Sequence, residues 1–236
     1  MSQPSWSKYA ETYDMLLQYN PFYQELYRDV LSHIECWTLE SGSRLIDLGA
    51  GTGNYSVTIA SIFPQLHVIH VDSDARMITQ ARGKARKMSA DIEFIETDAN
   101  SLQIDQESLS GCISIHALYT FPDPQETLTK LRSWMKPGSP FLFVDPGRVV
   151  NVLSWQWAIG SRMISKHGLR KTLQIMKEGK EVSRQNKLIS RMQAQGKYWL
   201  HSHEEFVEAV RSAGFRIDGA KTTFRGISDM VWGIAE

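Results

Sequence analysis

Short apolar runs alternate with stretches of helical periodicity along the first 146 residues of the chain. We expect five of these runs to be strands: RLIDL at 44–48, HVIHVD at 67–72, IEFIETD at 92–98, GCISIHAL at 111–118 and PFLFVDP at 140–146. Helical spacing is predicted between them, over 55–63, 74–88 and 125–135. Because these strands are apolar on both faces and alternate with helices, they predict a parallel sheet covered on both sides.

The last third of the chain has a different rhythm. Ser202 to Glu205 forms a capping box, which predicts a helix that begins there and ends at Gly214. Two strand-like segments follow, FRIDGAKTTF and GISDMVWGIAE, joined by a tight turn near Arg225–Gly226. Strands joined so closely are antiparallel. The sequence therefore predicts an α/β fold with a seven-stranded, mostly parallel sheet and a C-terminal antiparallel hairpin.

A helical segment at 148–200, which we call the lid segment, separates the fifth strand from the last helix. It carries eleven basic and two acidic side chains, whereas the rest of the chain carries 15 basic and 24 acidic ones. The neutral total of 26 against 26 therefore hides a strong asymmetry. We expect a single domain over 1–236, with an N-terminal helical cap at 1–40 and this basic insertion before the last helix.

Composition indicates an ordinary globular protein. The chain has 236 residues with 42% hydrophobic content, enough for one well-buried core. Cys36 and Cys112 give no framework of disulfides, which favours a reducing compartment. The N-terminus lacks the apolar core of a signal peptide, and the most apolar stretch, 149–161, is too short to span a bilayer. We expect a cytoplasmic protein.

A glycine-rich turn, LIDLGAGTGNYS, follows the first strand. Ligands bind at such strand-to-helix turns, at the carboxyl edge of a parallel sheet. The dinucleotide pattern G-x-G-x-x-G/A fails here because its third position is Asn54. No Gly-Lys-Ser/Thr follows, so the turn is not a P-loop either. The pattern is instead Asp47-x-Gly49-x-Gly51-x-Gly53.

With this pattern the chain resembles the class I S-adenosylmethionine-dependent methyltransferases of the small-molecule type. The motif DLGAGTG matches their first motif, Asp72 ends the second strand and Asp98 follows the third. The resemblance covers about 6–146 and 201–236. It implies a Rossmann-like fold and S-adenosylmethionine as cofactor, with S-adenosylhomocysteine as product.

The resemblance also implies roles for individual residues. Asp72 would accept hydrogen bonds from the ribose hydroxyls, Asp98 from the adenine amino group, and Asp47 would face the ammonium group of the cofactor. The alternative interpretation of Asp72 and Asp98 is a helix cap or a solvated turn. The full predicted cofactor set is Tyr9, Tyr13, Asp47, Gly49, Ala50, Gly51, Gly53, Asp72, Ser73, Met77, Asp98, Ala99 and His116.

Methyl transfer from a sulfonium is an in-line displacement, for which positioning supplies most of the rate. The catalytic candidates are His116 and Tyr119, after the fourth strand; Asp145, on the fifth, is also a candidate base. A packing role for His116 is the alternative. His201 and His203 are interpreted as surface residues. The histidine spacing predicts no metal site.

Tyr9 and Tyr13 lie one helical turn apart, and relatives fold such an N-terminal helix over the cofactor. The lid segment is predicted to build the acceptor site. Its charge fits a small or amphiphilic acceptor with an acidic group, contact with an anionic membrane, or a solvated face. Nucleic acid is the weakest alternative, because HALY stands where amino-directed nucleic-acid methyltransferases carry Asn-Pro-Pro-aromatic. We expect O- or N-methylation; a non-catalytic binding module is the other function class. The sequence indicates no oligomeric state.

Overall fold

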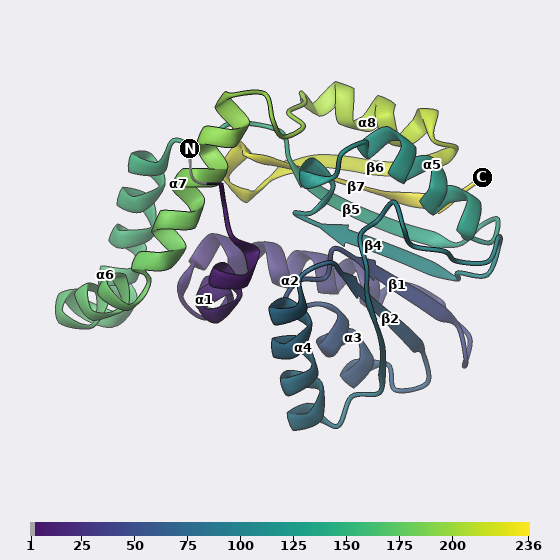
Figure 1. Cartoon of the computed structure of the whole chain (residues 1–236), viewed down its shortest axis with the longest axis horizontal. Helices are drawn as coiled ribbons and strands as arrows, with labels where there is room; N and C mark the ends of the chain where they lie inside the picture. The colour runs from purple at the N-terminus through teal and green to yellow at the C-terminus, as the bar shows by residue number, and fades with distance from the viewer. Residues whose placement is uncertain (1–2) are drawn as a thin grey trace.

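The structure is a computed structural model that describes residues 3–236 (Figure 1). Its elements are α1 (Trp6–Tyr19), α2 (Pro21–Glu35), β1 (Arg44–Leu48), α3 (Ser56–Ile62), β2 (His67–Asp72), α4 (Ala75–Met88), β3 (Ile92–Glu96), β4 (Gly111–Ile115), η1 (Leu118–Thr120), α5 (Pro124–Trp134), β5 (Pro140–Pro146), α6 (Val152–Glu178), α7 (Lys180–Ala194), α8 (His203–Ser212), β6 (Phe215–Thr223), η2 (Phe224–Gly226) and β7 (Ser228–Ala235).

The seven strands form one sheet in the order β3-β2-β1-β4-β5-β7-β6. Strands β1 to β5 run parallel, and β7 is antiparallel to both β5 and β6. The predicted mostly parallel sheet with a C-terminal hairpin is therefore confirmed. The order reverses between β1 and β4, so the carboxyl ends of these two strands flank the point where such sheets bind ligands.

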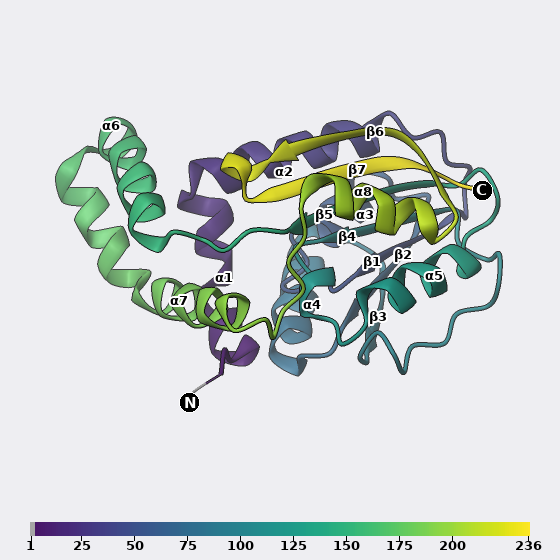
Figure 2. The same ribbon diagram turned by 90° about the horizontal axis from the view of Figure 1, so that it is seen from above.

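Two hydrophobic clusters hold the helices on the two faces of the sheet. Phe141 and Phe143 of β5 point into the cluster beneath α5 and α8, whereas Leu142 and Val144 point into the cluster beneath α2 and α3. This alternation follows from the two-residue period of a strand. Figure 2 shows the two layers of helices from above.

Local capping residues define the helix boundaries. The predicted capping box is present at the start of α8, where Ser202 accepts a hydrogen bond from the amide of Glu205. Asn20 separates α1 from α2 and accepts hydrogen bonds from the amides of Phe22 and Tyr23. These bonds satisfy amides that have no partner within the helix. The break at Asn20 lets α2 lie on the sheet while α1 turns toward α4 and α7.

Helices α6 and α7 occupy most of the lid segment and lie beside α1, at the end of the molecule opposite the C-terminus (Figures 1 and 2). Gly168 has a φ of 77° and a ψ of 163°, which breaks α6 into two helical halves. Between residues 3 and 236, no helix combines the length and the apolar character that a bilayer crossing requires.

Candidate functional site

The glycine-rich turn between β1 and α3 is bound to the end of β2. The amides of Gly49 and Ala50 both donate to the carbonyl of Val71, each at 2.9 Å. Gly49 has a φ of 73°, and a Cβ there would lie 2.3 Å from the Cβ of Ala117. Only glycine fits that position, because any side chain would collide with the segment that follows β4.

Asp72, at the end of β2, secures the same turn. Its carboxylate accepts hydrogen bonds from the amides of Gly51 at 2.8 Å and Asp74 at 2.9 Å. Burial raises its pKa, although these two amides oppose the shift. Each carboxylate oxygen has two lone pairs, so both oxygens keep the capacity to accept a further hydrogen bond.

Asp47 ends β1 in a less polar environment. Its side chain is 2% exposed and accepts one hydrogen bond, from the amide of Ser56 at 3.1 Å. Burial raises its pKa to about 7, with a further contribution from the nearby Asp72. A cation placed beside Asp47 would favour the ionised carboxylate.

A cavity of about 490 Å³, the loop cavity, lies over the turn at the carboxyl ends of β1, β2 and β4. It brings together most of the predicted cofactor residues: Tyr13, Asp47, Gly49, Ala50, Gly51, Asp72, Ser73, Met77, Asp98, Ala99 and His116. Asn54 and Tyr55 also line it, and the buried Asn54 Nδ2 and Tyr55 Oη make no hydrogen bond within 3.5 Å among the described residues, although both side chains lie near the hydroxyl of Tyr23. Such buried donors fit a polar ligand that accepts from them.

Gly53 and Tyr9 are absent from the lining of the loop cavity. A Cβ on Gly53, whose φ is 77°, would lie 2.9 Å from the Cβ of Ala81 and 3.0 Å from Val57. This third glycine therefore permits close packing of α3 against α4 and does not face the cavity.

The carboxylate of Asp98 is largely occupied by its own turn. It accepts hydrogen bonds from the amides of Asn100 and Ser101, both at 2.9 Å, and from the Ser101 hydroxyl at 2.8 Å. These bonds lower the pKa of Asp98. Asp98 thus lines the loop cavity and also has the turn-capping geometry that was the alternative interpretation.

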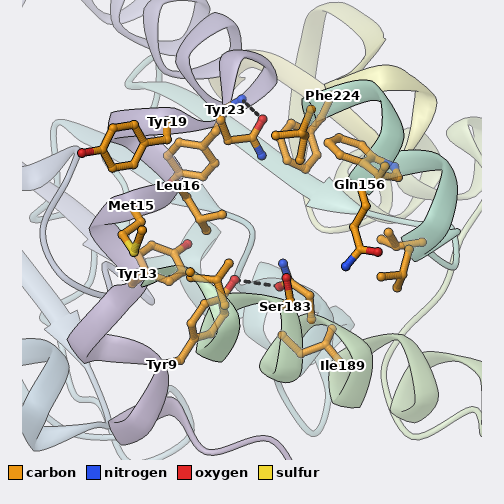
Figure 3. A pocket seen from close by; sticks show the side chains of 18 of the residues that line it. Tyr9, Tyr13, Met15, Leu16, Tyr19, Tyr23, Gln156, Ser183, Ile189 and Phe224 are labelled. Carbon is orange, nitrogen blue, oxygen red and sulfur yellow. Dashed lines mark hydrogen bonds between the residues drawn. The ribbon is translucent and has the colours of Figure 1, made fainter. Parts of the chain in front are cut away.

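A second cavity of about 240 Å³, the helix cavity, lies between α1, α6 and α7. Figure 3 shows its lining, in which tyrosines of α1 and α2 face Gln156 of α6 and Ser183 and Ile189 of α7. Its described lining is aromatic, aliphatic or polar and contains no Asp, Glu, Lys or Arg side chain. Arg162 of α6 points elsewhere, toward Glu25 at 2.6 Å. The basic charge of the lid segment is therefore not aimed into this cavity.

The two cavities meet at four residues, Trp6, Tyr13, Tyr23 and His116, which line both. The aromatic rings of α1 and α2 form a continuous series there, with Tyr9–Tyr13 centroids 5.0 Å apart and Tyr13–Tyr23 centroids 6.3 Å apart. The two cavities are therefore neighbours that share an aromatic wall.

His116 stands at this junction in a constrained conformation. Its φ of 55° is rare for a non-glycine residue, and strained backbone of this kind is concentrated at functional sites. Its Nε2 is 2.9 Å from the hydroxyl of Ser228, and its ring packs 4.9 Å from that of Phe224. Burial lowers the pKa of His116 to about 4, so the imidazole is neutral near pH 7.

Tyr9 and Tyr119 both line the helix cavity. Tyr9 donates a hydrogen bond to Asn186 of α7 at 2.7 Å, which ties α1 to the lid segment. Burial raises the pKa of both tyrosines, so they remain phenols near pH 7. Each can donate a hydrogen bond but cannot act as a ready base.

The interpretation of His201 as a surface residue is wrong. Its ring is buried between Trp199 and Phe206, and its Nε2 lies 3.6 Å from Asp145. His203 is half-buried and bonds Asp229 at 2.8 Å. Asp145 is fully buried, and burial raises its pKa to about 6. Asp145 lines neither cavity, and its cluster joins β5, β7 and the start of α8. The cluster still adjoins the cavities, because Asp145 interacts with Tyr119 and Asp229 directly follows Ser228, the partner of His116.

No group of three or more His, Cys, Asp or Glu side chains within residues 3–236 is arranged to hold a metal ion. The loop cavity instead offers separate carboxylates at separate strand ends, an arrangement suited to an extended organic ligand with several polar groups.

Comparison with known proteins agrees with this geometry. A family model described as "Methyltransferase domain" matches residues 39–206, which include β1 to β5 and the glycine-rich turn. The chain belongs to the class I S-adenosylmethionine-dependent methyltransferases.

The methyltransferase shares 36% identity over 110 residues with a carboxy-S-adenosyl-L-methionine synthase of Nautilia profundicola. That alignment covers 45% of this chain and 43% of the relative. A ubiquinone/menaquinone biosynthesis C-methyltransferase of Syntrophotalea carbinolica is 24% identical over 152 residues, 64% of each protein. The matched part of the chain thus spans less than two thirds of these curated relatives.

Solved structures share the fold of this methyltransferase. A SAM-dependent methyltransferase from Aquifex aeolicus superposes with a TM-score of 0.63 at 14% identity, covering 98% of both chains. Phosphoethanolamine N-methyltransferase 2 of Haemonchus contortus reaches a TM-score of 0.67 at 15% identity, covering 97% of this chain and 57% of its own.

Several cavity residues of the methyltransferase carry no sequence signal. Trp6, Tyr23 and Gln193 lie in segments whose pattern predicts only amphipathic helices. Asn54 and Tyr55 were not among the predicted cofactor residues either, although their place directly after the glycine motif was a signal that could have identified them.

We predict that Gly53→Ala lowers the free energy of unfolding by about 1–3 kcal/mol, because its Cβ would press on Ala81 at a strained φ. Because Gly53 is outside the lining of the loop cavity, the affinity of the folded variant for S-adenosylhomocysteine should differ from that of wild type by less than threefold. Denaturant titration and calorimetry measure the two quantities. A large loss of affinity in a protein of unchanged stability would contradict the packing role.

Proposed function

We propose that the chain transfers a methyl group from S-adenosylmethionine to a small, largely apolar acceptor held in the helix cavity. The observation that carries this proposal is the junction of the two cavities at Trp6, Tyr13, Tyr23 and His116. One cavity has the polar groups for the cofactor, the other has an apolar lining for an acceptor, and only the junction places the two ligands in contact.

The loop cavity suits each part of the cofactor. Asp72 would accept hydrogen bonds from the ribose hydroxyls, and Asp47 would pair with the ammonium group. Asn54 Nδ2 and Tyr55 Oη, which lack partners, would donate to the carboxylate of the cofactor. The remaining lone pairs of the Asp98 carboxylate would accept a hydrogen bond from the adenine amino group, and the amide of Ala99 would donate one to a ring nitrogen.

S-adenosylmethionine supplies an activated methyl group on a sulfonium, so the protein needs mainly to align acceptor and donor. The rings of Trp6, Tyr13 and Tyr23 enclose the junction and would attract positive charge there. They also exclude water, which strengthens electrostatic interactions inside the site. Such positioning contributes up to about 7–11 kcal/mol to a rate enhancement.

The helix cavity favours a neutral acceptor with one polar group. Its lining carries no charge among the described residues, so we do not propose an acidic group on the acceptor. Gln193 is buried in this lining, and its Oε1 has no partner among residues 3–236. An acceptor hydroxyl or N–H would satisfy that oxygen. The relatives include C- and N-methyltransferases, which support a small-molecule acceptor without identifying the atom that is methylated.

Neither catalytic candidate is suited to remove a proton from the acceptor. Tyr119 stays protonated near pH 7, and His116 has a pKa of about 4. We propose that His116 orients the acceptor through a neutral imidazole fixed by Ser228. The lid segment would close the helix cavity, with Gly168 and Gly179 as hinges. We propose that the whole chain is one domain, with residues 1–40 as its N-terminal cap.

Binding of S-adenosylhomocysteine should strengthen as pH rises. The carboxyl of Asp47 has a pKa of about 7, and only its ionised form attracts the ammonium group. Below that pKa the affinity should fall by about tenfold per pH unit. Calorimetry between pH 5.5 and 7.5 measures the slope, and Asp47→Asn should flatten it. A wild-type affinity independent of pH, or tight binding of NAD instead, would contradict the assignment.

Asp72→Asn should weaken S-adenosylhomocysteine binding by about 1.5–3 kcal/mol, because the ribose loses a charge-assisted acceptor and the amide must face the N–H groups of Gly51 and Asp74. Asp105→Asn, an exposed acid outside both cavities, is the matched control. Unchanged affinity together with a collapsed melting temperature would assign Asp72 to structure alone.

Methyl transfer should not depend on His116 protonation between pH 5.5 and 8. The low pKa of His116 keeps the imidazole neutral in this range, so at saturating donor the loss of activity that depends on His116 should come only as pH falls through about 4. Transfer of labelled methyl groups into an apolar metabolite extract gives the pH profile. His116→Gln should lower the rate and spare donor affinity. A wild-type midpoint near 6.5 that disappears in His116→Gln would contradict the neutral role.

A further inference from the structure

The outward face of α6 exposes a row of large apolar side chains. Leu153 and Trp157 are each 77% exposed, Leu169 is 59% and Leu173 is 58% exposed. Ile164 and Met176 complete this row, which we call the outer stripe. Its members follow helical spacing, at 153, 157 and 164 before the break at Gly168 and at 169, 173 and 176 after it. Each half of α6 therefore carries its own exposed apolar strip, one on either side of the break at Gly168.

The inward face of the same helix is apolar as well. Trp155, Ile159, Met163 and Ile175 line the helix cavity. A helix that is apolar on two faces is normally covered on both. An exposed apolar strip of this kind marks an interaction surface.

Basic side chains adjoin the outer stripe. Arg170 and Lys177 are seven residues apart and so lie on one side of the stripe, next to Leu169, Leu173 and Met176. Neither of these two cations has an ion pair with a carboxylate within the described chain. Lys166 and Lys171 add to this charge, and Glu178 is the acid of α6.

The positive charge beside the outer stripe favours an anionic membrane over a second copy of the chain as the partner. Two copies of the lid segment, each with an excess of nine positive charges, would repel one another across a shared stripe. Tryptophan and leucine beside lysine and arginine are the pattern of helices that lie in an anionic membrane surface. Helix α6 is also the outermost element at its end of the molecule, so a flat surface can reach it (Figures 1 and 2).

The outer stripe and the helix cavity are connected. Met176 is 46% exposed as part of the stripe and also lines the cavity. A molecule dissolved in the apolar layer beneath the stripe would therefore meet the cavity wall at Met176 without crossing charged protein surface.

We propose that the outer stripe docks on an anionic bilayer, and that the acceptor is a membrane-borne lipophile that enters the helix cavity past Met176. The second half rests on the proposed methyl transfer, whereas the docking stands on the stripe and its charge alone. Met176 is the one stripe residue that also lines a cavity, and the other five stripe residues line neither.

Co-sedimentation of the full chain with vesicles tests the docking. Wild type should bind vesicles of phosphatidylcholine with phosphatidylglycerol, bind phosphatidylcholine alone weakly, and release at high salt. Trp157→Gln with Leu173→Gln should reduce binding by at least about tenfold, and Arg170→Gln with Lys177→Gln by roughly tenfold to thirtyfold.

Matched controls make the same chemical changes away from α6. Ile62 and Met88 are exposed apolar residues on α3 and α4, and Arg86 and Lys87 are exposed cations on α4. Ile62→Gln with Met88→Gln, and Arg86→Gln with Lys87→Gln, should leave vesicle binding within twofold of wild type. An equal loss in a control pair would overturn docking through α6.

Donor affinity separates the two proposals. Calorimetry with S-adenosylhomocysteine should give the same affinity for wild type and every variant. If wild type binds S-adenosylhomocysteine but not the anionic vesicles, the docking is overturned and the proposed function is left intact. If it binds the vesicles but not S-adenosylhomocysteine, the proposed function alone is overturned. A wild-type dimer that Trp157→Gln with Leu173→Gln converts to a monomer would show that a second copy covers the stripe, and would also overturn the docking.

The acceptor is tested with labelled donor and vesicles of total membrane lipid extract. The label should enter the organic phase on extraction, and Trp157→Gln with Leu173→Gln should reduce that transfer by at least about fivefold. Label that enters only water-soluble compounds would overturn the membrane-borne acceptor.

Discussion

The site depends on a close crossing of backbone at the ends of three strands. After β1 the chain must turn between the end of β2 and the segment that follows β4, so closely that Gly49 has no room for a side chain beside Ala117. The amides of Gly49 and Ala50 are consumed by Val71, and that of Gly51 by Asp72. A loop with its N–H groups already bonded cannot cradle a phosphate as a P-loop does, so recognition passes to side chains at the strand ends.

The sequence predicts the glycine-rich turn and the elements around it. The glycine spacing, the apolar runs and the capping box at Ser202 are local patterns, and each corresponds to an element of the structure. The acids at the ends of β1 and β2 could be placed at one edge because parallel strands end together. The role of Gly53 could not be read this way, since an alternating motif does not tell which glycine faces a ligand and which faces a neighbouring helix.

The remaining features depend on contacts between distant parts of the chain. Tyr9 and Asn186 bond across 177 positions, and no local pattern of either helix predicts that they enclose one cavity. His201 precedes a capping box, which fixes where α8 begins but not what packs on the residue before it. The charge of the lid segment was evident from composition. The direction in which the basic side chains point was not evident, because α6 has two apolar faces and only packing decides which face turns inward.

The division of the site into two cavities has a consequence for how such proteins diversify. The strand ends around Asp47 and Asp72 are fixed by backbone bonds and tolerate little change. Helices α6 and α7 contribute nearly half of the lining of the helix cavity, with no strand register to preserve. Substitutions far apart in a protein act nearly independently. If the helix cavity holds the acceptor as proposed, mutation of the two helices can change the acceptor while the strand ends around Asp47 and Asp72 stay unchanged.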